Sequence, residues 1–236
     1  MKKLAVLVAS AALLTFTPAA TSAVRADPAQ RLRFGVAKNW AGYAAHGGPF
    51  TSASTSWREP SIACTGARSG VASFAGIDGD GTPTVEQVGT VDLCRSGGAV
   101  ARHAFYEMFP KGAVFIKKTV RANDAMSASV VANSSSSFTL TLVDTTQNWT
   151  FTTNQQASNA QLGSAEAITE APTARGSGIV PLANFGTINY SGTTANGQPL
   201  GNLGPEAITM VGNGGVIKAA PGGISGGSFS VTWHHA

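Results

Sequence analysis

Thr51-Ser-Ala-Ser-Thr-Ser-Trp57 decides the fold class, because small or apolar residues alternate in it with polar ones. Ser127-Ala-Ser-Val-Val131 follows the same period of two, which is typical of a half-buried antiparallel strand. No segment keeps a helical period over ten residues. The chain is therefore predicted to be all-β, with two packed antiparallel sheets or a barrel. Ten further segments are predicted strands: 71–78, 85–91, 101–108, 114–121, 138–143, 148–153, 165–170, 185–190, 207–211 and 228–233.

Domain organisation follows from where the alternation starts. It begins near Asn39, so residues 39–236 are predicted to form one domain, a length that β-sandwiches commonly reach without splitting. Residues 27–38 show no alternation and are predicted to be a linker or the remnant of a propeptide. Two Gly-rich stretches, 192–204 and 212–227, are predicted to be long loops on the domain.

The N-terminal residues have the three-part pattern of a secretory signal peptide. Met1-Lys2-Lys3 precedes an apolar run that ends at Phe16, and small residues follow as far as Ala26. Residues 1–26 are predicted to be the signal, with cleavage after Ala23 or after Ala26. The apolar run is too short to span a bilayer, and no later stretch offers the roughly 18 apolar residues that a spanning helix needs. We therefore expect a secreted protein without a membrane association once the signal is removed.

The charge of the chain argues against a nucleic-acid partner. The chain has 16 Lys and Arg against 12 Asp and Glu, a net charge of +4. Removing Lys2, Lys3 and Arg25 with the signal leaves +4 − 3 = +1, and the remaining basic residues are scattered along the chain. A surface with so few charges changes little on protonation, which suits a protein that works in acid. We expect a monomer.

The two cysteines, Cys64 and Cys94, are predicted to form one disulfide, because they are even in number and lie in an exported chain. Closing a loop of about 30 residues constrains the unfolded chain by roughly 3 kcal/mol. Neither cysteine has a local His or a helix start to lower its pKa, so a catalytic thiol is disfavoured.

Serine and metal chemistry are disfavoured as well. Gly223-Ile-Ser-Gly-Gly227 fits the G-x-S-x-G pattern of a serine-hydrolase nucleophile, but a strand follows Ser225 where a helix is needed, and no Asp or Glu comes later. The four histidines lack metalloprotease spacing, and Asp78-Gly-Asp-Gly81 is too short for a calcium loop. We expect neither a metal ion nor a cofactor.

Five motifs instead point to carboxylates and amides carried on strands. In chain order they are Asn39-Trp-Ala-Gly-Tyr43, Ser73-Phe-Ala-Gly-Ile-Asp-Gly79 with Val85-Glu-Gln-Val-Gly89, Phe105-Tyr-Glu-Met-Phe-Pro110, Ala165-Glu-Ala-Ile-Thr-Glu-Ala-Pro172 and Phe229-Ser-Val-Thr-Trp233. In this order and spacing they resemble the glutamic peptidases, also called eqolisins, over nearly all of the mature chain.

The resemblance implies a fold, an activity and two catalytic residues. The family fold is an antiparallel β-sandwich of two large sheets, similar to the concanavalin or legume-lectin type, and its members are acid endopeptidases that pepstatin does not inhibit. By position in the motifs, the catalytic glutamine is Gln87 and the catalytic glutamate is Glu166. Polypeptides are then the expected substrates.

The chemistry of these two residue types fits such an activity. A glutamate can take a proton from water as the water attacks the scissile carbonyl, and can then return that proton to the leaving nitrogen. An amide N–H stabilises the oxyanion and is not switched off by acid, whereas a histidine base would be protonated.

Six more residues are candidates for supporting the site or lining the substrate cleft. For Asp78, the alternative to a supporting role is that it only initiates the turn that follows it. For Glu107 it is cross-strand pairing, and for Glu170, which shares the face of Glu166, it is a solvated strand end. For the aromatic candidates Phe74, Trp57 and Tyr106, the alternative is a place in the core, where aromatic residues at strand spacing more often lie. The six are Asp78, Phe74, Trp57, Tyr106, Glu107 and Glu170.

This chain departs from the family motifs at a few positions. Phe74 stands where the family has Trp, and Ala167 and Thr169 stand where it has Trp and Val. These changes leave the side-chain preference of the cleft open. A carbohydrate-binding lectin-like sandwich and an inactive relative of the family remain as alternatives, since one fold can host several functions.

Overall fold

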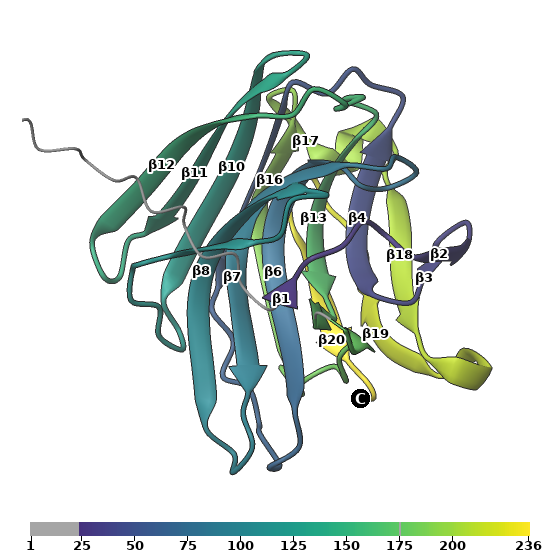
Figure 1. Cartoon of the computed structure of the whole chain (residues 1–236). Helices are drawn as coiled ribbons and strands as arrows, with labels where there is room; N and C mark the ends of the chain where they lie inside the picture. The colour runs from purple at the N-terminus through teal and green to yellow at the C-terminus, as the bar shows by residue number, and fades with distance from the viewer. Residues whose placement is uncertain (1–23, 175) are drawn as a thin grey trace, which may run out of the picture.

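The computed structural model describes residues 24–174 and 176–236 (Figure 1). Most of the predicted signal peptide therefore lies outside the described residues. Within them, regular structure is almost entirely β, apart from two short 3-10 turns, Leu200–Leu203 and Asn213–Gly215. None of the described helices is long and apolar enough to span a membrane.

The first sheet carries the motif strands, and each strand in it pairs antiparallel with its neighbours. Its centre is β6, which is hydrogen-bonded to β7 on one side and to β13 on the other. In spatial order the strands are β9 (Val114–Ile116), β8 (Val100–Phe109), β7 (Val85–Cys94), β6 (Ser69–Asp78), β13 (Ser164–Glu170), β4 (Trp40–His46) and β18 (Glu206–Val211).

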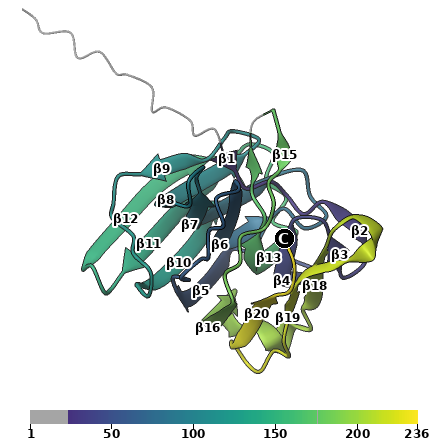
Figure 2. The ribbon, with the colours of Figure 1, turned by 90° about the horizontal axis from the view of Figure 1, so that it is seen from below.

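The second sheet packs behind the first, as the view from below shows (Figure 2). It meets the first sheet at β18, which pairs with β4 on one edge and with β19 on the other. The predicted two-sheet sandwich is thus confirmed, with the sheets joined along one side. In spatial order its strands are β12 (Trp149–Gln156), β11 (Ser137–Asp144), β10 (Ala125–Ser134), β5 (Ser52–Arg58), β16 (Thr187–Ala195), β20 (Phe229–Trp233) and β19 (Ile217–Pro221).

Three predicted boundaries are wrong. The strand predicted over 114–121 ends at Ile116, where a turn puts Lys118 N–H on the Ile116 carbonyl. The stretch 212–227, predicted to be a loop, contains the strand β19. The polar residue Lys218 interrupts the apolar pattern expected of a strand, although the Lys218 side chain is buried. In the stretch 192–204, β16 runs on to Ala195 through an irregularity between Ser191 and Thr194, and Gln198–Pro199 forms the short β17.

Alternation along β7 separates the two faces of the first sheet. Val88 and Thr90 face the second sheet, and Val88 belongs to the main apolar core between the sheets. Gly89 and Val91 face the other way, and Val91 belongs to a smaller apolar cluster with Trp40 and Phe74. At the end of β7 the predicted disulfide joins Cys94 to Cys64, with Cα atoms 5.4 Å apart.

The N-terminal residues cover this smaller cluster. Residues 27–38, predicted to be a linker or the remnant of a propeptide, contribute β2 (Arg31–Arg33) and β3 (Val36–Ala37), and β3 pairs with β18. Upstream, β1 (Val24–Arg25) pairs with β14 (Thr173–Ala174), which pairs in turn with β15 (Gly178–Ile179). In Figure 1, β1 crosses in front of β6.

All twelve Asp and Glu side chains of the chain are buried. No Asp or Glu side chain is therefore exposed on the surface of the protein. Several of the buried groups hold their protons strongly: burial raises the pKa of Glu86 to about 9, with a further rise from the neighbouring Asp78, and burial raises the pKa of Glu107 to about 8. Between the sheets, burial and the adjacent Glu59 raise the pKa of Asp92 to about 9.

The free energy of unfolding is expected to fall as the pH rises from about 4 to 9. A carboxyl whose pKa is raised on folding stabilises the fold below its unfolded pKa, and this contribution is lost as the pH passes through the folded pKa. The slope is about 1.4 kcal/mol per pH unit for each such group. Thermal unfolding from pH 3 to 8 checks this, and Glu86→Gln should flatten the fall. A Tm that stays constant or rises with pH would contradict it.

Candidate active site

One row of paired residues crosses the first sheet and gathers the candidate catalytic groups. On β7, Gln87 lies opposite Glu107 of β8 on one side and Gly76 of β6 on the other. Gly76 in turn lies opposite Glu166 of β13. Directly paired residues point to the same face of a sheet, so these side chains share the face that the N-terminal residues cover. The row continues through Ala44 to Glu206.

Gly76 leaves the space between the two candidate catalytic residues. The backbones of Gln87 and Glu166 are separated by two strand spacings, about 10 Å, with Gly76 between them. A Cβ at position 76 would lie 2.8 Å from Glu166 Oε1. The missing side chain therefore leaves room above β6, which the Glu166 carboxyl enters.

Gly76→Ala is expected to lower kcat/KM by roughly 10²-fold, because its methyl group would displace the Glu166 carboxyl and reacting groups tolerate little misplacement. The measurement is peptide hydrolysis by the purified variant. Gly223→Ala is the matched control, since a Cβ there meets no atom within 4 Å. Equal activity of Gly76→Ala and the wild type would show that this space is not used.

The Glu166 carboxyl is enclosed and has no regular partner. Its side chain is 2% exposed, and neither oxygen makes a hydrogen bond of normal geometry within the described part of the chain. Burial raises its pKa well above the ordinary range, the Ser164 hydroxyl offsets part of the rise, and the nearby carboxylates add to it. A covered Glu166 thus holds a proton strongly, and solvation in an open cleft would lower its pKa.

The Gln87 amide acts as a donor in this structure. Its Nε2 donates to the main-chain carbonyl of Ala26 over 2.6 Å, while its Oε1 is buried without a described partner. This amide group therefore already binds a peptide carbonyl, the group that becomes an oxyanion during hydrolysis.

Glu107 and Glu170 extend the site on either side of this contact. Glu107 Oε2 accepts the Ala26 N–H at 2.8 Å, and Glu170 Oε1 accepts the Asp27 N–H at 2.9 Å. Both side chains are fully buried, so Glu170 is not the solvated strand end that was one alternative. Glu166 and Glu170 lie on the same face of the sheet, as alternation predicts. The hydrogen bonds of Glu170 go to Asp27 and Asn39 and not to Glu166.

Asp78 fixes the segment that leads into the Glu166 strand. Its carboxylate accepts the N–H groups of Gln161, Leu162 and Gly163 at 2.7, 2.9 and 2.7 Å. Asp78 itself has a φ of 66°, so it also ends β6 in a left-handed turn. The Asp78 carboxylate thus holds the segment before β13, and its backbone forms the turn after β6.

Phe74 lies on the site face, whereas two other aromatic candidates do not. Phe74 is fully buried and packs edge-on against Trp40 at 5.5 Å. Trp57 lies on β5 of the second sheet, where its Nε1 donates to Glu59, so the placement of Trp57 in the cleft is wrong. Tyr106 neighbours Glu107 on β8 and must point to the opposite face, where it stacks on Phe151, so its placement in the cleft is wrong as well.

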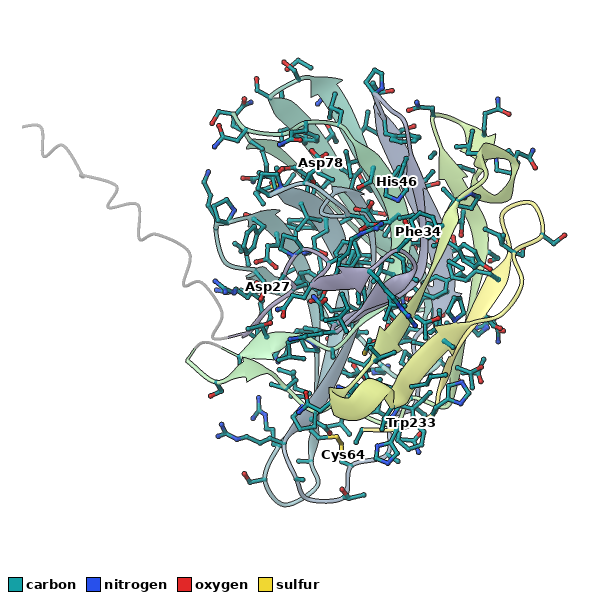
Figure 3. The ribbon with its side chains drawn as sticks, turned by 90° about the vertical axis from the view of Figure 1, so that its right-hand side faces the viewer. Asp27, Phe34, His46, Cys64, Asp78 and Trp233 are labelled. Carbon is teal, nitrogen blue, oxygen red and sulfur yellow. A yellow bond between two sulfur atoms is a disulfide. The ribbon has the colours of Figure 1, made fainter. Side chains whose placement is uncertain are left out.

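A cluster that the motifs did not reveal lies at the end of the same row. His46 Nε2 lies 3.2 Å from Asp80 and 3.1 Å from Glu206, and both carboxylates pair with the Arg31 guanidinium. His46 and Asp78 lie toward one end of the molecule and Cys64 toward the other (Figure 3). The four side chains of this cluster, His46, Asp80, Glu206 and Arg31, come from segments far apart in the sequence. Pairing of β4 with β18 brings His46 and Glu206 together, and the sequence carries no local signal of it.

Comparisons with known proteins identify the same architecture. The model of the peptidase A4 family matches residues 38–233. Scytalido-glutamic peptidase with a peptide-based transition state analogue is similar in structure, with a TM-score of 0.70 and 22% identity over 84% of this chain and 98% of that chain. SCP-B, an eqolisin in complex with the tripeptide Ala-Ile-His, gives 0.67 and 22% over the same shares.

A third solved structure, aspergilloglutamic peptidase from Aspergillus niger, gives a TM-score of 0.57 and 24% identity over 70% of this chain and 99% of that chain. At these identities the structural matches establish the fold. The search among curated proteins found no match.

Proposed function

Because the chain belongs to the peptidase A4 family, the glutamic peptidases, and is a glutamic endopeptidase, we propose that Glu166 and Gln87 are its catalytic pair. The observation that carries the proposal is the hydrogen bond from Gln87 Nε2 to a peptide carbonyl, in the same row of the sheet as the unpartnered and enclosed carboxyl of Glu166. The register that places both side chains beside Gly76 supports a shared water between them.

The reaction proceeds by direct attack of water. In an open cleft, the ionised Glu166 holds a water above Gly76. As a polypeptide covers the site, burial makes the carboxylate more basic, so that it takes a proton from the water while the water attacks the scissile carbonyl. The Gln87 amide donates to the developing oxyanion, and Glu166 returns the proton to the leaving nitrogen.

Two features of the protein support the proposal that it is a secreted enzyme active at acid pH. The surface carries no Asp or Glu side chain, so acid adds little charge to it. The raised pKa values of the buried carboxyls make the fold more stable in acid than at neutral pH. The Cys64–Cys94 disulfide and the signal-type leader support a secreted protein. Its substrates are unfolded polypeptides, and it acts as a monomer without a cofactor.

The test is digestion of an acid-unfolded protein between about pH 2 and 5, a range that brackets the pKa of a free glutamate. In water enriched in ¹⁸O, each cut is expected to place one solvent oxygen in the new carboxyl group and to create one new amino terminus. Ser225→Ala, which removes the serine of the G-x-S-x-G stretch, should keep the wild-type rate. No new amino termini anywhere in this pH range would reject the proposal.

A further inference from the structure

A buried lysine that the proposed reaction does not use lies on β19. Its neighbour Ala219 belongs to the apolar core between the sheets, so Lys218 points to the outside of the sandwich. Lys218 is nevertheless only 8% exposed. Its aliphatic stem packs over Gly212, where a Cβ would lie 3.5 Å from Lys218 Cδ. The turn that follows β18 therefore covers the stem of this lysine.

The Lys218 ammonium group has no counter-ion. Within residues 24–174 and 176–236 it takes part in no ion pair and no side-chain hydrogen bond. Burial lowers the pKa of Lys218, and no carboxylate opposes this shift. A buried charge without a partner costs free energy, and an anion bound beside it would offset that cost.

Lys218 lines a hollow of about 340 Å³, a size typical of small-molecule pockets. Lys38, which is exposed, lines the same hollow, so two cationic side chains from distant parts of the chain share it. None of the described Asp and Glu side chains lines it. The rest of the wall is largely apolar and includes Ile179, Pro181 and Val211, together with the amide of Asn213.

We propose that this hollow binds a small phosphate monoester, with the phosphate between Lys218 and Lys38 and the organic body against Ile179 and Val211. Lysine binds phosphate as a point charge. Two lysines favour a phosphate monoester, which carries about −1.5 to −2 charges at pH 7, over a carboxylate with a single charge. Apolar area that the organic body covers adds to the affinity.

The hollow is separate from the catalytic row, and the inference does not depend on the proposed function. None of the described residues that line the hollow belongs to the row of Gln87, Gly76 and Glu166. In Figure 1 and in Figure 2, β19 lies on the opposite side of the molecule from β7. Lys218→Met should therefore hydrolyse peptides at the wild-type rate.

The test is calorimetric titration of the full chain at pH 6 and constant ionic strength, with four probes. Phenyl phosphate supplies both the phosphate and an apolar body, inorganic phosphate only the anion, benzyl alcohol only the body, and benzoate a carboxylate on the same body. Phenyl phosphate is expected to bind with a Kd below about 1 mM, at least 10-fold more tightly than inorganic phosphate or benzoate. Benzyl alcohol should not bind detectably.

Lys218→Met tests the lysine at the centre of the site. Methionine fills a similar space without a charge, so the variant should fold with an unchanged or raised Tm. It is expected to bind phenyl phosphate at least 10-fold more weakly than the wild type. Lys111→Met, which removes an exposed lysine outside the hollow, is the matched control and should bind as the wild type does.

Thermal unfolding gives a second readout. At a phenyl phosphate concentration ten times the Kd, the Tm of the wild type and of Lys111→Met should rise by roughly 3–6 °C relative to sodium chloride of equal ionic strength. The Tm of Lys218→Met should not change.

Three results would overturn the inference. These are no binding of phenyl phosphate to the wild type, equal affinities of the wild type and Lys218→Met, and benzoate that binds as tightly as phenyl phosphate. The first is also the result expected if the terminal carboxylate of Ala236, a residue that lines the hollow, already occupies the place of the phosphate. Digestion of polypeptides by the wild type would still stand after any of the three.

Discussion

Glu166→Gln is expected to lower kcat by roughly 10²–10⁴-fold, the range that a positioned acid and base contributes. Glutamine has nearly the same shape, so it can fill the enclosed space, but it can neither take a proton from water nor deliver one to the leaving nitrogen. The measurement is steady-state hydrolysis of a peptide at pH 4, with KM and kcat determined separately. Because the residue is buried and its covered form holds a proton, the substitution should leave the Tm unchanged or raised.

The outcome that would contradict this role is a folded Glu166→Gln protein with wild-type kcat. Glu107→Gln is the matched comparison, since Glu107 is another buried carboxyl in the same row. Its contact in the structure is to a backbone N–H, so its loss should act mainly on KM.

Gln87→Ala is expected to lower kcat by about 10²–10³-fold, as removal of one oxyanion donor does. KM should change less, because the Ala26 contact in the structure is only one of several backbone hydrogen bonds to the bound peptide. The measurement is the same peptide assay, made on a variant whose fold is checked by its Tm.

Gln87→Glu tests whether residue 87 acts by donating a hydrogen bond to the oxyanion or only by filling its space in the site. When protonated, a glutamic acid at this position can still donate to the carbonyl, and on ionisation it can only repel the oxyanion. Its activity should therefore be partly retained at low pH and lost as the pH rises. A Gln87→Glu profile that runs parallel to the wild-type profile would contradict the donor role.

Alternation and ordered motifs were enough to predict the fold and to place several site residues. The strand of Glu166 was predicted to within one residue, because Gly163 and Pro172 bound it, whereas the strand of Gln87 runs three residues past its predicted end at Val91. The turn at Asp78 follows from its Gly neighbours. The same alternation rule places Glu107 and Tyr106 on opposite faces, so Tyr106 could have been excluded from the cleft by the sequence alone.

Other features depend on contacts between distant segments and had no local signal. Trp57 lies on a strand with a clear period, but which sheet that strand joins is a matter of topology. Arg31 and its partners Asp80 and Glu206 come from three separate parts of the chain. The N-terminal peptide lacks alternation because it binds through its backbone, which any sequence provides, so its place over Gln87 could not be predicted.

The rate at which new amino termini appear in an acid-unfolded polypeptide, compared between the wild type and the double variant Gln87→Ala/Glu166→Gln, tests the catalytic pair most directly. The account predicts steady release by the wild type and, from the folded double variant, no release above the rate without enzyme. Release at the wild-type rate by the double variant would contradict it, because the peptidase would then use other residues.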